Sequence, residues 1–79
     1  MSNRHNPARH CEIGACASTL DPERGVMGWV QECHYVRGED IGGDIHNLER
    51  GHATIADAIT WARQEAARRK LIIIGKYAA

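Results

Sequence analysis

The residues of this chain best suited to chemistry are three cysteines and the histidines beside them: Cys11, Cys16 and Cys33, with His10 and His34. Zinc accepts thiolates and imidazoles in a tetrahedral shell. The chain has no Cys-x-x-Cys pair, however, and an offset of five residues places Cys11 and Cys16 on opposite faces of a strand. An odd cysteine count without an export signal also disfavours a disulfide framework. The pattern predicts free thiols with neither metal nor cofactor, and leaves a small zinc-binding domain as an alternative.

Catalysis would need a convergent group of side chains, and the sequence does not supply one. Cys33 and His34 are neighbours on an expected strand, so they point to opposite faces and cannot form a nucleophile–base pair with each other. A chain of 79 residues can bury only one thin core, which leaves little material to enclose a reaction. We therefore expect a protein that binds rather than an enzyme.

The charges balance overall, with 10 Lys and Arg against 10 Asp and Glu, but the middle of the chain is acidic and its end is basic. The basic run Arg68-Arg69-Lys70 stands where a helix should end, and cations there complement the helix dipole. Nucleic-acid binding is therefore disfavoured, although a small RNA-binding domain stays open. The longest apolar run, over 71–74, is far short of a membrane span. We expect a cytoplasmic protein.

The hydropathy pattern predicts a polar tail over 1–9 and one α+β domain over 10–79. Alternating residues indicate strands over 11–19 and 27–36, joined by the turn at 21–25, and a short strand near 45–48. On the second strand, we expect the core face to be the set that begins with Met27, Trp29 and Gln31 and continues to Cys33 and Tyr35. The loop over 37–44 carries three carboxylates and lacks both phosphate-loop and calcium-loop spacing.

A helix should begin after Thr54, because Thr54 can cap it and Asp57 occupies the capping-box position, and it should run to about Lys70. Its buried stripe is expected to hold Ile55, Ile59, Ala62 and Ala66, with Ala58 at the margin. An Ile-rich strand follows over 71–77. The fold class is therefore α+β: an antiparallel β-sheet of three to four strands packed on one α-helix, in the order β-β-(β)-α-β.

Two surfaces are candidates for binding a partner. Trp61 lies about 120° from the buried stripe, near Glu65 and Arg68, and tryptophan among charged residues is typical of a binding hot spot; the alternative is a satellite contact at the edge of the sheet. The acidic residues of the middle segment could form a patch for a basic partner, or a solvated loop. The candidate partner-binding residues are Trp61, Glu39, Asp40, Asp44, Glu65 and Arg68, and the acidic group also includes Glu32 and Glu49. Homodimerisation through a sheet edge or face stays open.

Two resemblances sharpen the functional expectation. The segment Gly51-His52-Ala53-Thr54-Ile55-Ala56-Asp57-Ala58-Ile59 resembles the helix start G-D-T-x-E-E-A of HicB-like antitoxin domains, with His52-Ala53 in place of the single Asp. The size and order of elements are similar to small phage-encoded anti-CRISPR proteins, which implies stoichiometric inhibition of a Cas effector subunit or complex. We expect a non-enzymatic protein that acts by protein binding, most sharply an anti-CRISPR-like inhibitor, with a HicB-like antitoxin-type module as the alternative.

Overall fold

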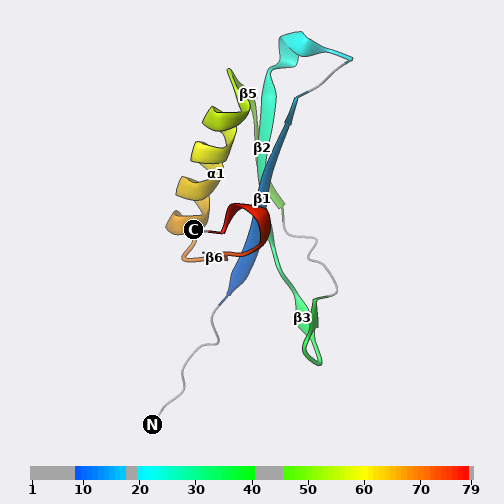
Figure 1. Cartoon of the computed structure of the whole chain (residues 1–79), viewed down its shortest axis with the longest axis vertical. Helices are drawn as coiled ribbons and strands as arrows, with labels where there is room; N and C mark the ends of the chain where they lie inside the picture. The colour runs from blue at the N-terminus through cyan, green and yellow to red at the C-terminus, as the bar shows by residue number, and fades with distance from the viewer. Residues whose placement is uncertain (1–8, 18–19, 41–45, 79) are drawn as a thin grey trace.

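A four-stranded sheet with one helix on one face makes up the body of the protein (Figure 1). The computed structural model describes residues 9–17, 20–40 and 46–78. The strands lie in the order β5 (His46–His52), β2 (Val26–Glu32), β1 (His10–Ala17) and β6 (Ile72–Ile73), and the helix is α1 (Ile55–Arg68). Short strands β3 (Tyr35–Val36) and β4 (Glu39–Asp40) form a separate hairpin that projects from the body. The α+β class, with a sheet packed on one helix, is confirmed.

The sheet is mixed, so the expectation of a purely antiparallel sheet was wrong for one strand pair. β1 pairs antiparallel with β2, and β2 with β5, but β6 runs parallel to β1. Its N–H groups donate to the outer side of β1, from Ile72 to the carbonyl of Arg9 and from Ile74 to that of Cys11, each at 2.9 Å. The parallel direction follows from α1, which carries the chain back across the sheet so that β6 starts at the same end as β5.

The core lies between α1 and the facing side of β1 and β2. Its members are small residues or branched aliphatic ones: Cys11, Ile13, Val30, Ile59, Ala62, Ala66 and Leu71. Alanine side chains on α1 let the helix backbone approach the sheet closely. The approach is tightest at Gly28, where an added Cβ would lie 2.7 Å from the carbonyl oxygen of Ala58. The closeness of helix and sheet therefore depends on a residue without a side chain.

The structure reverses the expected faces of β2. Val26, Gly28 and Val30 are buried against α1, whereas Met27, Trp29 and Gln31 point to the other face and are only half-buried. The prediction of Met27, Trp29 and Gln31 as the core face was wrong because it compared only the polar residues of the two faces, one against two, and left the space that the helix needs out of account. The close helix instead selects the face that carries glycine.

The start of α1 confirms the predicted cap. Thr54 has extended backbone angles, and its Oγ1 accepts a hydrogen bond from the Asp57 N–H at 3.0 Å. The predicted buried stripe is right for Ile59, Ala62 and Ala66, and for Ala58 at its margin, but Ile55 is 48% exposed and Glu65 is buried in addition.

Proline and glycine residues mark the turns of the chain. Pro22–Arg24 forms one turn of 3₁₀ helix, and Gly25 after it has a φ of +76°. Arg37 and Gly38 both have positive φ, as a two-residue hairpin turn requires between β3 and β4. The expected strand over 27–36 is divided into β2 and β3. The last strand is also shorter than predicted, because Gly75, at a φ of +87°, leads into a 3₁₀ turn over Gly75–Tyr77.

Candidate functional site

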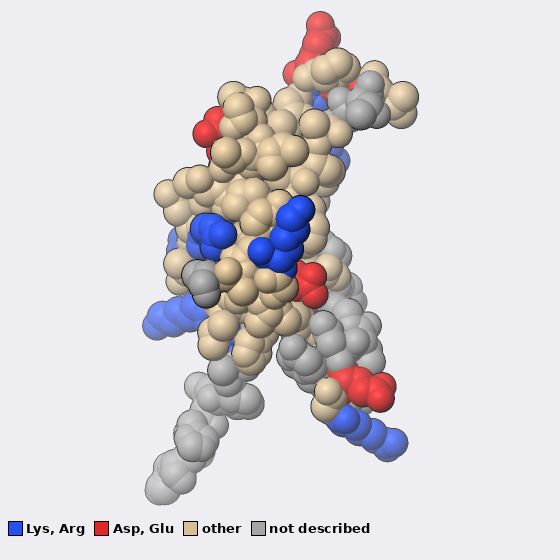
Figure 2. Space-filling model, viewed as in Figure 1, with Lys and Arg blue, Asp and Glu red and all other residues tan. Residues whose placement is uncertain are grey.

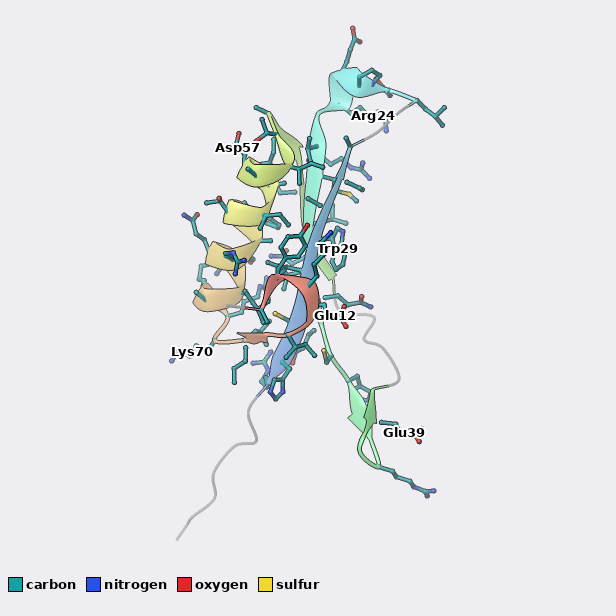
Figure 3. All side chains as sticks on the ribbon, viewed as in Figure 1. Glu12, Arg24, Trp29, Glu39, Asp57 and Lys70 are labelled. Atoms are coloured by element: carbon teal, nitrogen blue, oxygen red, sulfur yellow. The ribbon has the colours of Figure 1, made fainter. Side chains whose placement is uncertain are left out.

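The face of the sheet opposite α1 is the most distinctive surface of the described residues. Met27, Trp29 and Gln31 of β2 and Leu48 of β5 line a hollow of about 250 Å³ on this face. We call these four residues the open face. Leu48 stands opposite Trp29 in the register and is 48% exposed. Figure 3 shows Trp29 and Glu12 on the side of the sheet away from the helix.

A glycine on the neighbouring strand fixes the position of the Trp29 ring. Gly14 pairs with Trp29, and an added Cβ at Gly14 would lie 2.2 Å from Cζ2 of the indole. The ring therefore rests directly on the backbone of β1, which holds it rigid while one side stays accessible. Sequence reasoning missed this contact because it did not fix the register of the two strands: a turn centred on 21–25 would set Gly14 opposite Glu32, whereas the structure pairs Gly14 with Trp29.

Polar groups surround the apolar hollow. By strand alternation, Glu12 and Cys16 of β1 share the open side with Trp29, and both are exposed. Arg50 of β5 is exposed beyond Leu48. An apolar centre with a polar rim is the usual anatomy of a protein–protein interface.

A second polar group lies at the other end of the core, where α1 ends. Glu65 is 8% exposed, and its carboxylate accepts hydrogen bonds from Arg68, the last residue of α1, from Arg69, which caps it, and from Asn47 of β5. The Arg68 guanidinium, and after it that of Arg69, holds the pKa of the Glu65 carboxyl below its usual range. These bonds tie α1 to β5, so the group contributes to the fold.

Arg9 and Glu32 form a similar pair. Arg9 Nε and Nη2 each donate to a carboxylate oxygen of Glu32 at 2.7 Å, a bidentate arrangement. The hydrogen bond from Arg9 lowers the pKa of Glu32. Arg9, which the sequence placed in the tail, is therefore bonded into the sheet, and the rest of that tail lies outside the described residues.

The predicted partner-binding residues on α1 are mainly structural in their contacts. Trp61 is half-buried, packs against the core and lies 5.7 Å, centroid to centroid, from the His52 ring. His52 Nε2 comes within 3.1 Å of a Glu49 oxygen, yet it lacks a well-oriented hydrogen bond within the part of the chain that is described. Glu65 and Arg68 are bonded to each other. The satellite-contact interpretation fits these surroundings, and a binding role for Trp61 stays a prediction.

The predicted acidic residues are not gathered with the helix residues. Glu39 is exposed on the projecting hairpin, well away from α1 (Figure 3), and Asp40 lies in β4 beside it. Asp44 lies outside the described residues. Figure 2 likewise shows the acidic groups of that view at separate places, on the hairpin, on the body and at the Pro22–Arg24 turn. The six predicted residues therefore do not form one surface in the described structure.

The three cysteines differ in what they could do. Cys11 is fully buried, and burial raises the pKa of its thiol to about 11, which keeps it neutral and unreactive at ordinary pH. Cys16 is exposed and Cys33 is half-buried. Within residues 9–17, 20–40 and 46–78, no three His, Cys, Asp or Glu side chains come together as a metal site, and no helix is long and apolar enough to cross a membrane. What the described arrangement offers is a rigid surface.

Comparison with known proteins adds no relative: no family model matches the chain, and neither a curated protein nor a solved structure is similar to it. The functional argument therefore depends on the geometry alone.

Proposed function

We propose that the protein acts by binding another protein through the open face of its sheet, and that it does so without catalysing a reaction. The observation that carries this proposal is the apolar hollow between Trp29 and Leu48, on the side of the sheet that α1 leaves uncovered. Aromatic side chains held rigid in an apolar centre supply most of the energy in protein interfaces. Trp29, fixed on Gly14, has that character.

The shape of the hollow favours a protein over a small molecule. Sites for small ligands enclose most of the ligand in roughly 300–1,000 Å³. The hollow holds about 250 Å³ and is lined by only four side chains, so it can receive one apolar side chain of a partner but cannot surround a ligand.

The charges favour a protein over a nucleic acid. A base stacked on Trp29 would bring its phosphates near Glu12, which is exposed on the same side of the sheet. The basic residues Arg68 and Arg69 lie at the C-terminal end of α1, on the opposite side of the sheet. Nucleic-acid binding needs several cations along the path of the backbone, and the polar rim described above offers one, Arg50, together with the carboxylate of Glu12.

Within this class, two finer functions stay predictions. An anti-CRISPR-like inhibitor would use the open face to occupy a site on a Cas effector subunit or complex. A HicB-like antitoxin-type module would use it to bind a small toxin. The identity of the partner separates the two, and both place the protein in the cytoplasm.

The test compares two substitutions of exposed apolar residues on opposite sides of the molecule. Met27→Asp puts a charge in the hollow, and Ile55→Asp puts one on α1, where Ile55 is 48% exposed. Each variant and the wild type are immobilised and incubated with nuclease-treated host extract, after circular dichroism has shown that all three are folded. We expect a stoichiometric protein partner with the wild type and Ile55→Asp, and at least tenfold less of it with Met27→Asp.

Three results would contradict the proposal. The first is a partner retained in full by Met27→Asp, and the second is a partner lost when nucleic acid is digested. The third is turnover of a small substrate by the purified protein that requires Cys33 or a histidine. A captured Cas subunit would support the inhibitor, and a captured small toxin the antitoxin-type module.

A further inference from the structure

We infer that two copies of this chain associate through β5, pairing antiparallel about Leu48, so that their two sheets become one continuous eight-stranded sheet. The inference concerns the outer edge of β5 and does not depend on the proposed function of the open face.

β5 is the long edge strand of the sheet, and no other strand of the described residues pairs with its outer side. It has seven residues and stands last in the strand order, whereas the opposite edge strand, β6, has two and is followed by the 3₁₀ turn at Gly75–Tyr77. Natural edge strands are blunted by proline, lysine or bulges, because an open edge is a template for a further strand. β5 contains neither Pro nor Lys. Its register with β2 is regular from His46 to Glu49, and the irregularity that the strand carries lies beyond this stretch, between the pairs Gly28–Glu49 and Val26–His52.

The backbone hydrogen bonds show which groups of β5 face outward. On β1, the carbonyls of Arg9 and Cys11 point to β6, and that of His10 accepts from Cys33 on the β2 side. Alternation along the strand then directs Glu12, Gly14 and Cys16 toward their β2 partners Gln31, Trp29 and Met27.

The same alternation continues across β2. Gly28 and Val30 must point to β5, where their partners are Glu49 and Asn47. The residues of β5 that alternate with these partners in the regular stretch, His46 and Leu48, therefore direct their N–H and C=O groups away from the sheet. These are the groups that a second strand would bond.

A two-fold axis perpendicular to the sheet pairs residues that share a face, so it must pass through a residue position of β5. An axis at Glu49 sets two carboxylates directly opposite each other, which is destabilising. An axis at Leu48 pairs the outward-facing backbone groups of Leu48 with those of Leu48 of the second copy, and it sets Glu49 opposite Asn47 rather than opposite a second carboxylate. The Leu48 register is the self-complementary one.

The Leu48 register also buries apolar surface. Leu48 is 48% exposed on the open face, and Trp29 is its cross-strand neighbour. Pairing would place the two leucines side by side between the two Trp29 rings and join the two hollows in one apolar strip. α1 packs mainly over β1 and β2, away from the outer side of β5.

The first test is the mass of the full chain in solution. Light scattering should give about twice the 8.8 kDa of one copy at high concentration, with a concentration-dependent fall toward the monomer. Leu48→Lys sets two cations opposite each other at the axis and should raise the dissociation constant of the dimer at least tenfold. A wild-type monomer at millimolar concentration, or a dimer that Leu48→Lys leaves intact, would overturn the inference.

The second test locates the axis with a matched pair of cysteine variants. Leu48→Cys and Ile72→Cys are made with Cys16→Ser; Leu48 and Ile72 are 48% and 50% exposed, but they lie on opposite edges of the sheet. Residues facing each other in a hydrogen-bonded antiparallel pair have Cα atoms about 5.5 Å apart, within reach of a disulfide. Mild oxidation should cross-link Leu48→Cys and leave Ile72→Cys monomeric on a denaturing gel. Equal cross-linking of both variants, or cross-linking of Ile72→Cys alone, would refute pairing through β5.

Discussion

The contact between Gly28 and the α1 backbone gives the sharpest prediction about stability. An alanine Cβ at residue 28 would lie 2.7 Å from the Ala58 carbonyl oxygen, 0.7 Å short of the 3.4 Å at which ordinary contact begins. It would also lie 3.1 Å from Cε3 of Trp61. Because the closest atom belongs to the helix backbone, Gly28→Ala can be accommodated only if α1 moves away from the sheet.

The magnitude follows from two opposing effects. Adding a methyl group to a close-packed core costs about 1–3 kcal/mol. Replacing a strand glycine returns about 0.5–1 kcal/mol, because glycine loses the most backbone freedom on folding. We expect Gly28→Ala to lower the free energy of unfolding by about 1–2 kcal/mol, which for a domain of this size lowers Tm by roughly 4–16 °C.

Urea unfolding followed by circular dichroism measures this loss, with an unchanged m-value as the sign that only stability has moved. Gly14→Ala is the matched control, because its Cβ meets the Trp29 side chain rather than a helix backbone, and the added methyl group would displace the ring toward the hollow without moving α1. It should cost less stability than Gly28→Ala and should alter the fluorescence of Trp29. Unfolding of Gly28→Ala at the wild-type urea concentration or above would refute the close approach of α1.

Three further predictions concern Trp61, Glu65 and the cysteines. Trp61→Ala should lower the free energy of unfolding by about 2–3 kcal/mol in the same urea assay, because the ring packs against the core. A loss below about 0.5 kcal/mol would contradict this structural role and favour the binding role predicted for Trp61. The pKa of the Glu65 carboxyl is lower in the folded state than in the unfolded state, so the ionised carboxylate stabilises the fold above the unfolded pKa of about 4.3. This stabilisation is lost as the pH falls through the folded pKa. Urea titrations from pH 7 to pH 3 should therefore show Glu65→Gln less stable than the wild type at pH 7 and the two converging in acid; a constant gap would contradict this. At pH 8, iodoacetamide should modify Cys16 in the folded protein and Cys11 only after unfolding, as mass spectrometry would show. Because the pKa of Cys11 is raised in the folded state, the free energy of unfolding should also fall as the pH rises from about 8.5 toward 11. Modification of both thiols at equal rates would contradict the burial of Cys11.

Local signals in the sequence predicted the elements well. The Thr54 cap, the alternation of β1 and the turn residues around Pro22 each act within a few positions, and the structure has all three. Such signals could not predict which face of β2 is buried, because Gly28 is a core position only where α1 passes over it. The direction of β6 could have been predicted, since a strand that follows a returning helix runs parallel to the strand before the helix.

The candidate site was harder to predict because its parts meet across strands. Trp29 lies on the open side because the opposite face of β2 packs against α1, and its ring is held in place by Gly14 on β1. Glu65 looked like a surface charge on the helix, but Asn47, 18 residues earlier, and the two arginines enclose it. Pairs this distant in the chain leave no periodic pattern.

The parallel pairing of β1 with β6 also governs when the protein can fold during synthesis. Contacts between His10 and Ile72 and between Cys11 and Ile73 join segments some sixty residues apart, so the second side of β1 stays unpaired until Ile72 and Ile73 have left the ribosome. Until then the nascent chain presents the edge of its innermost strand to its surroundings. A pause or premature stop in translation before Ile72 would leave that edge open to other chains and to proteases.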